Sequence, residues 1–303
     1  DLIKYTHAKT EKKEISRNKI AVIYATGTIN SGKGNENKIG SETTAQAIKQ
    51  AREDKNVKAI VLRINSGGGS ALASDVIWRE TVLAKAEKPL IVSMGDYAAS
   101  GGYYIACAAD SIIANPTTLT GSIGVFGMIP NLQRLYENKL GITIDTVNTN
   151  HHADMGINRA LTKFEKNKIQ KSVEDIYMTF INHVAEGRKM STAAVDEIGQ
   201  GRIWSGYDAK KIGLIDVYGG IEKAIDIAVY LAKIEDYRII SLPKKKDPFT
   251  ELALKIGNSS QFTTFEDILF TKLGFKTELT EPIETLLKSE KIQARVPFIM
   301  KLE

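Results

Sequence analysis

Three runs of apolar residues in the first third of the chain, at 19–25, 57–64 and 90–94, predict buried strands. Each run is continuous rather than alternating, which is typical of parallel strands that are covered on both faces. Between these runs, at 41–53 and 70–86, apolar residues recur at helical spacing. This order of strands and helices predicts an α/β fold with a largely parallel sheet.

The same alternation continues to about residue 240. Further helices are expected at 103–109, 131–138, 163–186, 191–198 and 220–233, strands at 111–114 and 142–147, and loops at 118–125 and 148–161.

Pro243 and the three lysines that follow it mark a boundary. We therefore expect one domain at 19–240 and a helical C-terminal appendage at 241–303, where short amphipathic patterns recur. The polar and charged residues 1–18 are expected to be a lead-in.

The composition is that of a soluble globular chain, with 303 residues, 43% hydrophobic and 25% charged. The net charge of +5 is not gathered into an Arg-rich face, so no nucleic-acid partner is expected. No run of 18 apolar residues occurs, so no transmembrane span is predicted. The single cysteine, Cys107, lies in an apolar helical run, which favours a buried packing role.

Ser100 follows an apolar strand and precedes Gly101, Gly102 and a helical pattern. A serine at a strand-to-helix turn exposes its hydroxyl, and the N–H groups after it favour developing negative charge. An acyl-transfer nucleophile needs both features. The alternative is that Ser100 only caps the helix, which is a common role for serine.

A serine nucleophile needs a base, and the chain has four histidines. His151 and His152 share a loop that could approach Ser100, although adjacent loop histidines are more often only solvated. They make a poor metal site without a third ligand at a recognisable spacing, and neither a metal nor a cofactor is expected. The lysines of the helix that starts near residue 163 are expected to be solvated and protonated, so they are poor bases.

A second set of candidates is Gly67, Gly68 and Gly69, which follow a predicted parallel strand. Glycine lets the backbone approach a ligand closely. N–H groups of this loop could form an oxyanion hole with that of Gly101. The alternative is a turn that the strand–helix connection requires.

Four segments occur in an order that resembles the signal peptide peptidase A family, also called protease IV. They are R-I-N-S-G-G-G-S (63–70), A-A-S-G-G-Y-Y (98–104), A-N-P-T-T-L-T-G-S-I-G-V (114–125) and G-R-I-W-S-G-Y-D-A-K-K-I-G-L-I-D (201–216). The resemblance covers about residues 19–235. It implies a Clp-protease/crotonase-like fold with repeated β-β-α and βα units.

The resemblance also implies a serine peptidase with Ser100 as the nucleophile and a lysine as the general base. The oxyanion hole would be formed by Gly101 with Gly67 and Gly68. An extended peptide would lie along two strand edges, whose substrate-binding residues are Gly69, Ser70, Ser122, Ile123 and Gly124.

Residual signal peptides are the substrates that the family implies. Its members are homo-oligomers, with a tetramer as one form, on the periplasmic or extracytoplasmic side of the bacterial cytoplasmic membrane. This chain would reach the membrane through a missing upstream anchor.

One position departs from the family pattern. Short members carry the catalytic lysine in a K-D-M-like context, and the matching residues here are Ala153, Asp154 and Met155. In long tandem members the N-terminal half supplies the lysine and the C-terminal half the serine. The chain resembles that C-terminal half, so its base is expected from an upstream domain or a neighbouring subunit.

Two other functions stay open. The chain could be a non-catalytic scaffold half, or a crotonase-type acyl-CoA enzyme that shares the glycine-based oxyanion hole but uses no serine nucleophile.

Overall fold

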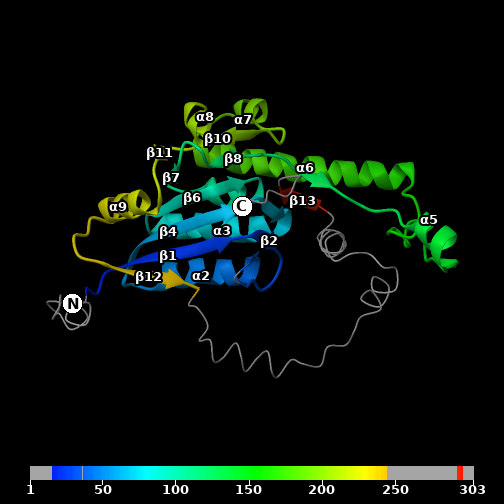
Figure 1. Ribbon diagram of the computed structural model, residues 1–303, viewed down its shortest axis with the longest axis horizontal. Coiled ribbons are helices and arrows are strands. Elements are labelled where there is room, and N and C mark those ends of the chain that lie inside the picture. The colour runs from blue at the N-terminus through cyan, green and yellow to red at the C-terminus, as the bar shows by residue number, and fades with distance from the viewer. Residues whose placement is uncertain (1–15, 36, 244–291, 296–303) are drawn as a thin grey trace, which may run out of the picture.

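The computed structural model describes residues 16–35, 37–243 and 292–295 (Figure 1). Its larger sheet has the strand order β10-β8-β6-β4-β1-β12, with β7 beside β6 and β11 beside β7. The strands are β1 (Lys19–Thr26), β4 (Val57–Ser66), β6 (Leu90–Ala99), β7 (Ser111–Ala114), β8 (Leu119–Gly121), β10 (Ile203–Ser205), β11 (Val217–Tyr218) and β12 (Arg238–Leu242). All pairs are parallel except β10 with β8, so the expected α/β class and its largely parallel sheet are confirmed.

A second, smaller sheet has the order β3-β2-β5-β13-β9. Its strands are β2 (Thr28–Asn30), β3 (Lys38–Gly40), β5 (Gly68–Ser70), β9 (Phe126–Gly127) and β13 (Ile292–Arg295). The glycine-rich segment is therefore an inner strand of this sheet, between β2 and β13. Strand β13 comes from near the end of the chain and pairs antiparallel with both β5 and β9.

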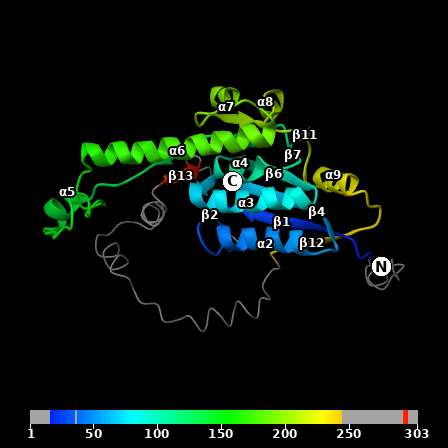
Figure 2. The same cartoon turned by 180° about the vertical axis from the view of Figure 1, so that it is seen from behind.

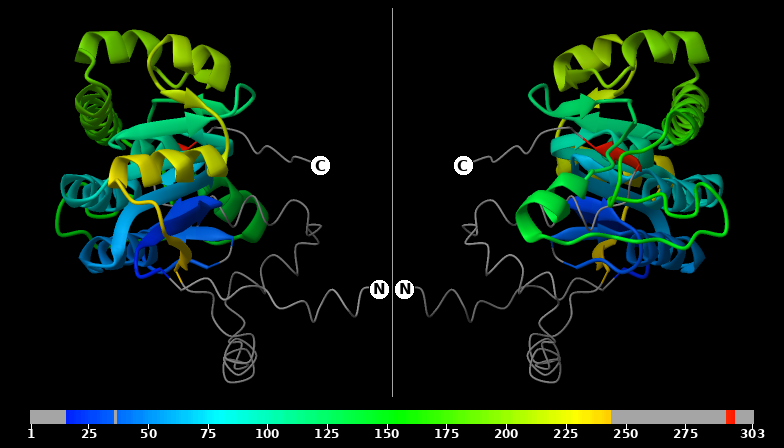
Figure 3. Two further views of the ribbon diagram at one scale, coloured as in Figure 1. Left: turned by 90° about the vertical axis from the view of Figure 1, so that its left-hand side faces the viewer. Right: turned by 90° about the vertical axis from the view of Figure 1, so that its right-hand side faces the viewer.

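Helices cover both faces of the larger sheet (Figure 3). On one face, α2 (Ser41–Glu53) and α3 (Ala71–Glu87) pack on each other and on side chains such as Leu62 and Val92. On the other face, α9 (Ile221–Ala232) covers Val61 and Ile91. Neighbouring residues of one strand thus enter different cores, which explains why these strands are continuously apolar.

The long helix α6 (Lys163–Arg188) extends well beyond the sheet (Figures 1 and 2). The chain reaches its far end through residues 128–162, here called the arm, which contain α5 (Gln133–Leu135) and the π-helical turn η1 (Tyr136–Leu140). At its other end, α6 leads into α7 (Thr192–Ile198) and α8 (Gly206–Lys211). The arm exposes apolar side chains, namely Met128, Leu135, Ile142, Ile144, Val147 and Met155.

Three expected elements differ in the structure. Strand β6 runs on to Ala99 and is followed by α4 (Gly101–Ala106), because its polar end pairs with β4 and β8. The expected loop 118–125 contains β8. Residues 142–147 form no strand, because they take part in no strand pairing among the described residues; Val147 is fully exposed.

The expected domain limits stay a prediction. Residues 1–15 of the lead-in and most of the appendage at 241–303 lie outside the described residues. The described parts of the appendage include residues 241–242, which end β12, and Ile292–Arg295, which form β13, so both differ from the expected helix. No helix in the described ranges is long and apolar enough to span a membrane.

Candidate active site

Ser100 lies at the junction of β6 and α4, with its backbone in a sparsely populated conformation. Its φ is 53° and its ψ is −116°, which residues other than glycine rarely adopt. Such a conformation costs about 1–3 kcal/mol and persists only where the surroundings hold it. Pairing of Ala98 with Ser66 and of Ala99 with Gly121 holds the residues before it on both sides.

The side chain of Ser100 does not cap α4. No cap hydrogen bond is present, and the hydroxyl instead donates to the carbonyl oxygen of Gly124 at 3.3 Å. Ser70 shows the contrast, because its Oγ accepts from the N–H of Ala73 at 3.1 Å and caps α3. The capping interpretation of Ser100 is therefore wrong, and its strained backbone needs another explanation.

The structure brings Gly68 and Gly101 together beside Ser100. A β-carbon added to Gly68 would lie 2.6 Å from the backbone nitrogen of Gly101, and one added to Gly101 would lie 3.1 Å from the Cα of Gly68. Gly68 also has a φ of +94°, which favours glycine. Gly67 lies between β4 and β5, one residue further from this contact. The glycines predicted to form the oxyanion hole therefore lie next to one another in the structure.

The expected substrate-binding residues divide into two groups. Gly69 and Ser70 belong to β5, which pairs with β2 on one side and with β13 on the other. Ser122, Ile123 and Gly124 instead pack on the segment that follows α7.

Backbone hydrogen bonds hold this second group. The N–H of Ser122 donates to Arg202 at 2.7 Å, and Ile123 accepts from Gly201 at 2.8 Å. Ser122 also has a positive φ of 47°. The motifs 114–125 and 201–216 therefore meet, and together they position the carbonyl of Gly124 that holds the Ser100 hydroxyl. Residues 122–124 were expected to form the second strand edge along the peptide. The strand that pairs with β13 there is instead β9, which the sequence patterns did not predict.

No base reaches Ser100 within the part of the chain that the structure describes. In that part no lysine or histidine lies within hydrogen-bond distance of its Oγ. His152 is turned to Glu165, with 2.9 Å between Nδ1 and Oε1. His183 is turned to Asp75, with 3.2 Å between Nε2 and Oδ1. Both rings thus have carboxylate partners away from the serine.

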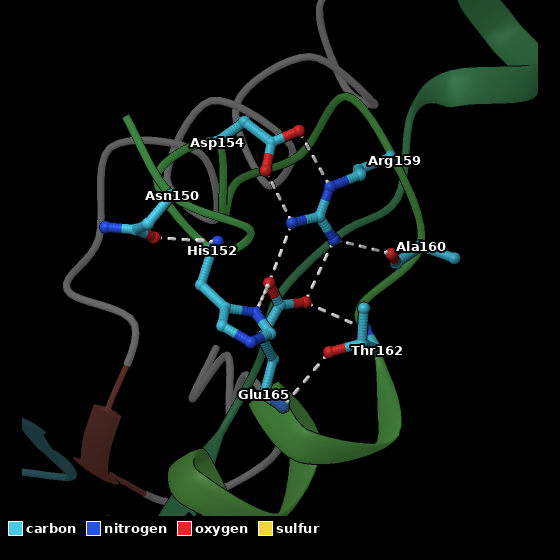
Figure 4. A network of polar contacts seen from close by, with 7 residues as sticks. All are labelled: Asn150, His152, Asp154, Arg159, Ala160, Thr162 and Glu165. Carbon is cyan, nitrogen blue, oxygen red and sulfur yellow. Dashed lines mark hydrogen bonds and ion pairs between the residues drawn. The ribbon is translucent and has the colours of Figure 1, made fainter. Parts of the chain in front are cut away.

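Ala153, at the position expected for the lysine, lies in an exposed turn of the arm. Its neighbours in the sequence, His152 and Asp154, take part in a network of charges (Figure 4). Arg159 forms two-pronged contacts with Asp154, at 2.7 and 3.0 Å, and with Glu165, at 2.7 and 2.9 Å. Thr162 and Glu165 complete a capping box at the start of α6. The T-x-x-E spacing in the sequence indicates the capping box, whereas no sequence pattern indicates the contacts of Arg159 with Asp154 and Glu165.

These contacts shift the acidity of the carboxyl groups. The hydrogen bond from Arg159 lowers the pKa of Asp154 to about 2. Arg159, His152 and the N–H of Thr162 hold the pKa of Glu165 far below its usual range. The network is therefore ionised at neutral pH and fixes the turn on either side of Ala153.

Two further side chains next to the nucleophile have structural roles. Cys107 is fully buried, and burial raises the pKa of its thiol to about 12, so the expected packing role is confirmed. The hydroxyl of Tyr104 donates to Asp75 at 2.7 Å, and its ring lies 4.6 Å from that of Phe180. These contacts join α4, which carries the N–H of Gly101, to α3 and α6.

Comparison with known proteins decides the family. A family model described as Peptidase family S49 matches residues 83–235, which include Ser100, Gly101 and the loop 121–124. The chain belongs to peptidase family S49. The architecture confirms the expected α/β class with a largely parallel sheet, and the Clp-protease/crotonase-like fold stays what the resemblance implies.

The S49 chain is 44% identical over 221 residues to "Protease 4" of Salmonella typhi, covering 73% of this chain and 36% of that protein. It is 37% identical over 236 residues to a "Putative signal peptide peptidase SppA" of Enterococcus faecium, covering 75% of this chain and 68% of that protein. It is also similar to a solved structure of a ClpP1 mutant from Listeria monocytogenes, at 18% identity and a TM-score of 0.43, covering 67% of this chain and 94% of that one.

The resemblance to the signal peptide peptidase A family is confirmed. The chain spans about a third of the length of the Protease 4 relatives that it matches.

Proposed function

We propose that this S49 chain carries the nucleophilic half of a serine endopeptidase. Ser100 is the nucleophile, and the observation that carries the proposal is its strained, buried position beside Gly68 and Gly101. A hydroxyl that is held at a strand-to-helix turn, with helix N–H groups next to it, suits acyl transfer.

In the proposed reaction an extended peptide pairs with β5 through main-chain hydrogen bonds, on the side that β13 occupies in this structure. The Oγ of Ser100 leaves the carbonyl of Gly124, gives its proton to the base and attacks the scissile carbonyl carbon. The N–H of Gly101, with Gly67 or Gly68 of the glycine loop, stabilises the negative oxygen. In this structure the N–H of Gly68 donates to the Oγ of Ser66 at 3.1 Å, so it must turn from that oxygen to take part. The peptide C–N bond breaks, the amine leaves with the proton, and water hydrolyses the acyl-enzyme.

The general base is a lysine that this chain does not supply. The position that would carry it in a self-sufficient relative is Ala153, whose methyl group cannot take a proton. An upstream domain or a neighbouring subunit contributes the lysine instead. The exposed apolar side chains of the arm support contact with such a domain, because exposed apolar patches often mark interaction sites.

Signal peptides left in or at the bacterial cytoplasmic membrane are the proposed substrates, on its periplasmic or extracytoplasmic side. The name of the Enterococcus faecium relative supports this substrate class. The proposed assembly is a homo-oligomer, with a tetramer as one form, anchored through an upstream segment. No nucleic acid and no cofactor takes part.

Hydrolysis of a synthetic signal peptide tests the proposal. The full-length protein should cleave the peptide, and Ser100→Ala should lose the activity. Ser172→Ala is the matched control, because it removes an exposed serine hydroxyl of α6 that lies outside the candidate site. An active Ser100→Ala variant would exclude Ser100 as the nucleophile, and tight acyl-CoA binding without peptide cleavage would favour the crotonase-type alternative.

A further inference from the structure

The loop 121–124 holds Ser100 and depends on contacts of its own. The N–H of Ser100 donates to the carbonyl oxygen of Gly121 at 2.8 Å, and the hydroxyl donates to that of Gly124 at 3.3 Å. Within this loop Ser122 has a positive φ of 47°, which residues other than glycine rarely adopt. Such a conformation persists only where the surroundings hold it, so the loop needs support from outside.

The turn 199–202, between α7 and β10, gives this support. Gly201 donates its N–H to the carbonyl oxygen of Ile123 at 2.8 Å. A β-carbon added to Gly124 would lie 2.7 Å from the Cα of Gly201, so the two backbones are in contact. The turn is strained as well, because Gln200 has a positive φ of 57°. It therefore needs a support of its own.

Tyr177 of α6 holds this turn. Its hydroxyl donates to the Oδ1 of Asp196 at 2.7 Å and accepts from the N–H of Gln200 at 3.0 Å. A β-carbon added to Gly199 would lie 3.0 Å from the Oη of Tyr177 and 3.4 Å from the carbonyl oxygen of Ile123. The tyrosine hydroxyl and the loop that holds Ser100 are therefore both next to the same backbone residue.

The position and protonation of Tyr177 are well defined. Helices α6 and α7 pack together (Figures 1 and 2), and Phe180 and Ile181, within the next turn of α6, are buried in the core. Burial and the contact with Asp196 raise the pKa of the Tyr177 hydroxyl to about 12. The hydroxyl thus keeps its proton at neutral pH, and it can donate to Asp196 while it accepts from Gln200.

We infer, on the basis of the proposed function, that Tyr177 is a positioning residue for the Ser100 nucleophile. It acts through the turn 199–202 on the loop 121–124, and through this loop on the two carbonyl groups that hold Ser100. Strand β5, which is proposed to bind the peptide, is held separately by its pairing with β2. Loss of the tyrosine hydroxyl should therefore misplace the attacking oxygen and leave peptide binding intact.

Kinetics of Tyr177→Phe in the full-length protein test this inference. The kcat for a synthetic signal peptide and the rate of phosphonate labelling at Ser100 should both fall about tenfold or more, with KM unchanged, because a misplaced nucleophile slows only the chemical step. Tyr230→Phe removes the hydroxyl of an exposed tyrosine on α9 and should leave both rates unchanged. Ile181→Val shortens a buried side chain of α6, which lowers stability without altering the turn, and should also leave both rates unchanged.

The outcomes separate the inference from the proposed function. Unchanged rates in Tyr177→Phe would overturn the positioning role and leave the peptidase proposal standing. An equal loss in Ile181→Val would also overturn it, because the loss would then follow stability. If the unaltered full-length protein neither labels at Ser100 nor cleaves the peptide, the proposed function fails and the inference fails with it.

Gly199→Ala tests the same contact without a change to the tyrosine. The added methyl group would lie between the Tyr177 hydroxyl and Ile123, so it should displace the turn and slow labelling of Ser100 about tenfold or more. Gly220→Ala is the control, because nothing lies within 4 Å of its added β-carbon. Equal labelling rates in the two variants would overturn the proposed role of this contact.

Hydrogen exchange measures whether the displacement reaches the loop. The amides of Ser122 and Gly201 keep their own acceptors in Tyr177→Phe. They should nevertheless exchange about tenfold or more faster than in the unaltered protein, because the turn that pairs with the loop opens more often. In Tyr230→Phe they should exchange as in the unaltered protein. Unchanged exchange in Tyr177→Phe would show that the tyrosine hydroxyl does not hold the loop, which would overturn the inference.

Discussion

The hydroxyl of Ser100 donates a hydrogen bond to the carbonyl oxygen of Gly124 over 3.3 Å. The proposed nucleophile is therefore hydrogen-bonded to the backbone and not to a base. The same loop accepts the Ser100 N–H at Gly121, 2.8 Å away. These two bonds hold Ser100 in its unusual backbone conformation. For the reaction, the hydrogen bond to Gly124 has to break, because the hydroxyl must turn from this carbonyl toward the base.

The strain at Ser100 predicts a difference in stability between two variants that both lack the hydroxyl. Ser100→Gly should have a free energy of unfolding about 1 kcal/mol higher than Ser100→Ala, because only glycine adopts a positive φ without strain. Denaturant unfolding with equal m-values measures this difference. Equal stabilities, or a less stable glycine variant, would contradict the strained backbone at this position.

The closeness of Gly101 to Gly68 predicts that Gly101→Ala damages the site. The added β-carbon would lie 2.7 Å from the Oγ of Ser74 and 2.8 Å from the carbonyl oxygen of Ala294. Displacement of one oxyanion donor should slow peptide hydrolysis by about a hundredfold or more. Gly220→Ala is the control, because nothing lies within 4 Å of its added β-carbon. Similar rates in both variants would show that Gly101 takes no part in the oxyanion hole.

The Asp154–Arg159–Glu165 network predicts a fall in stability in acid. The pKa of Asp154 in the folded chain is about 2, against an ordinary value of 3.8. As the pH falls, the unfolded chain takes up this proton first, so the stabilisation is present above pH 3.8 and is lost as the pH approaches about 2.

Thermal unfolding between pH 5 and pH 2 measures this loss in the unaltered protein and in Asp154→Asn, whose amide does not titrate. The melting temperature of Asp154→Asn should fall less over this range. Parallel curves would mean that Asp154 is not held by Arg159 in solution.

The missing base predicts a gain of function at one position. Ala153→Lys should make the isolated chain react with a serine-directed phosphonate probe about tenfold or more faster, because the new amine stands where self-sufficient relatives carry their base. Ala160→Lys places the same charge on an exposed position of the arm and should leave the rate unchanged. An equal gain in both variants would indicate a general effect of charge.

Local sequence patterns predicted the parts of the fold that short-range physics decides. The apolar runs ending at Ile64 and Met94 identified buried parallel strands, and Ser70 identified the cap of α3. The extension of β6 to Ala99 depends on pairing with β8, which follows later in the chain, so the local pattern with its Gly95 and Asp96 suggested a turn.

The candidate site was predictable only in part, for the same reason. Ser100 and the glycines stand out by their order along the chain. The pairing of Ala294 with Gly69 joins residues more than two hundred positions apart, and no local feature of I-Q-A-R indicates it. The two-pronged contacts of Arg159 likewise depend on how the arm turns back onto the start of α6.

Probe labelling mapped by mass spectrometry tests the central claim most directly, which is that Ser100 is a nucleophile whose base comes from outside this chain. The full-length protein should carry the adduct on Ser100, and the isolated chain should label about a hundredfold more slowly, because it lacks the base. An adduct on another residue would contradict the assignment of Ser100. Equal labelling rates in the two proteins would show that the chain contains its own base.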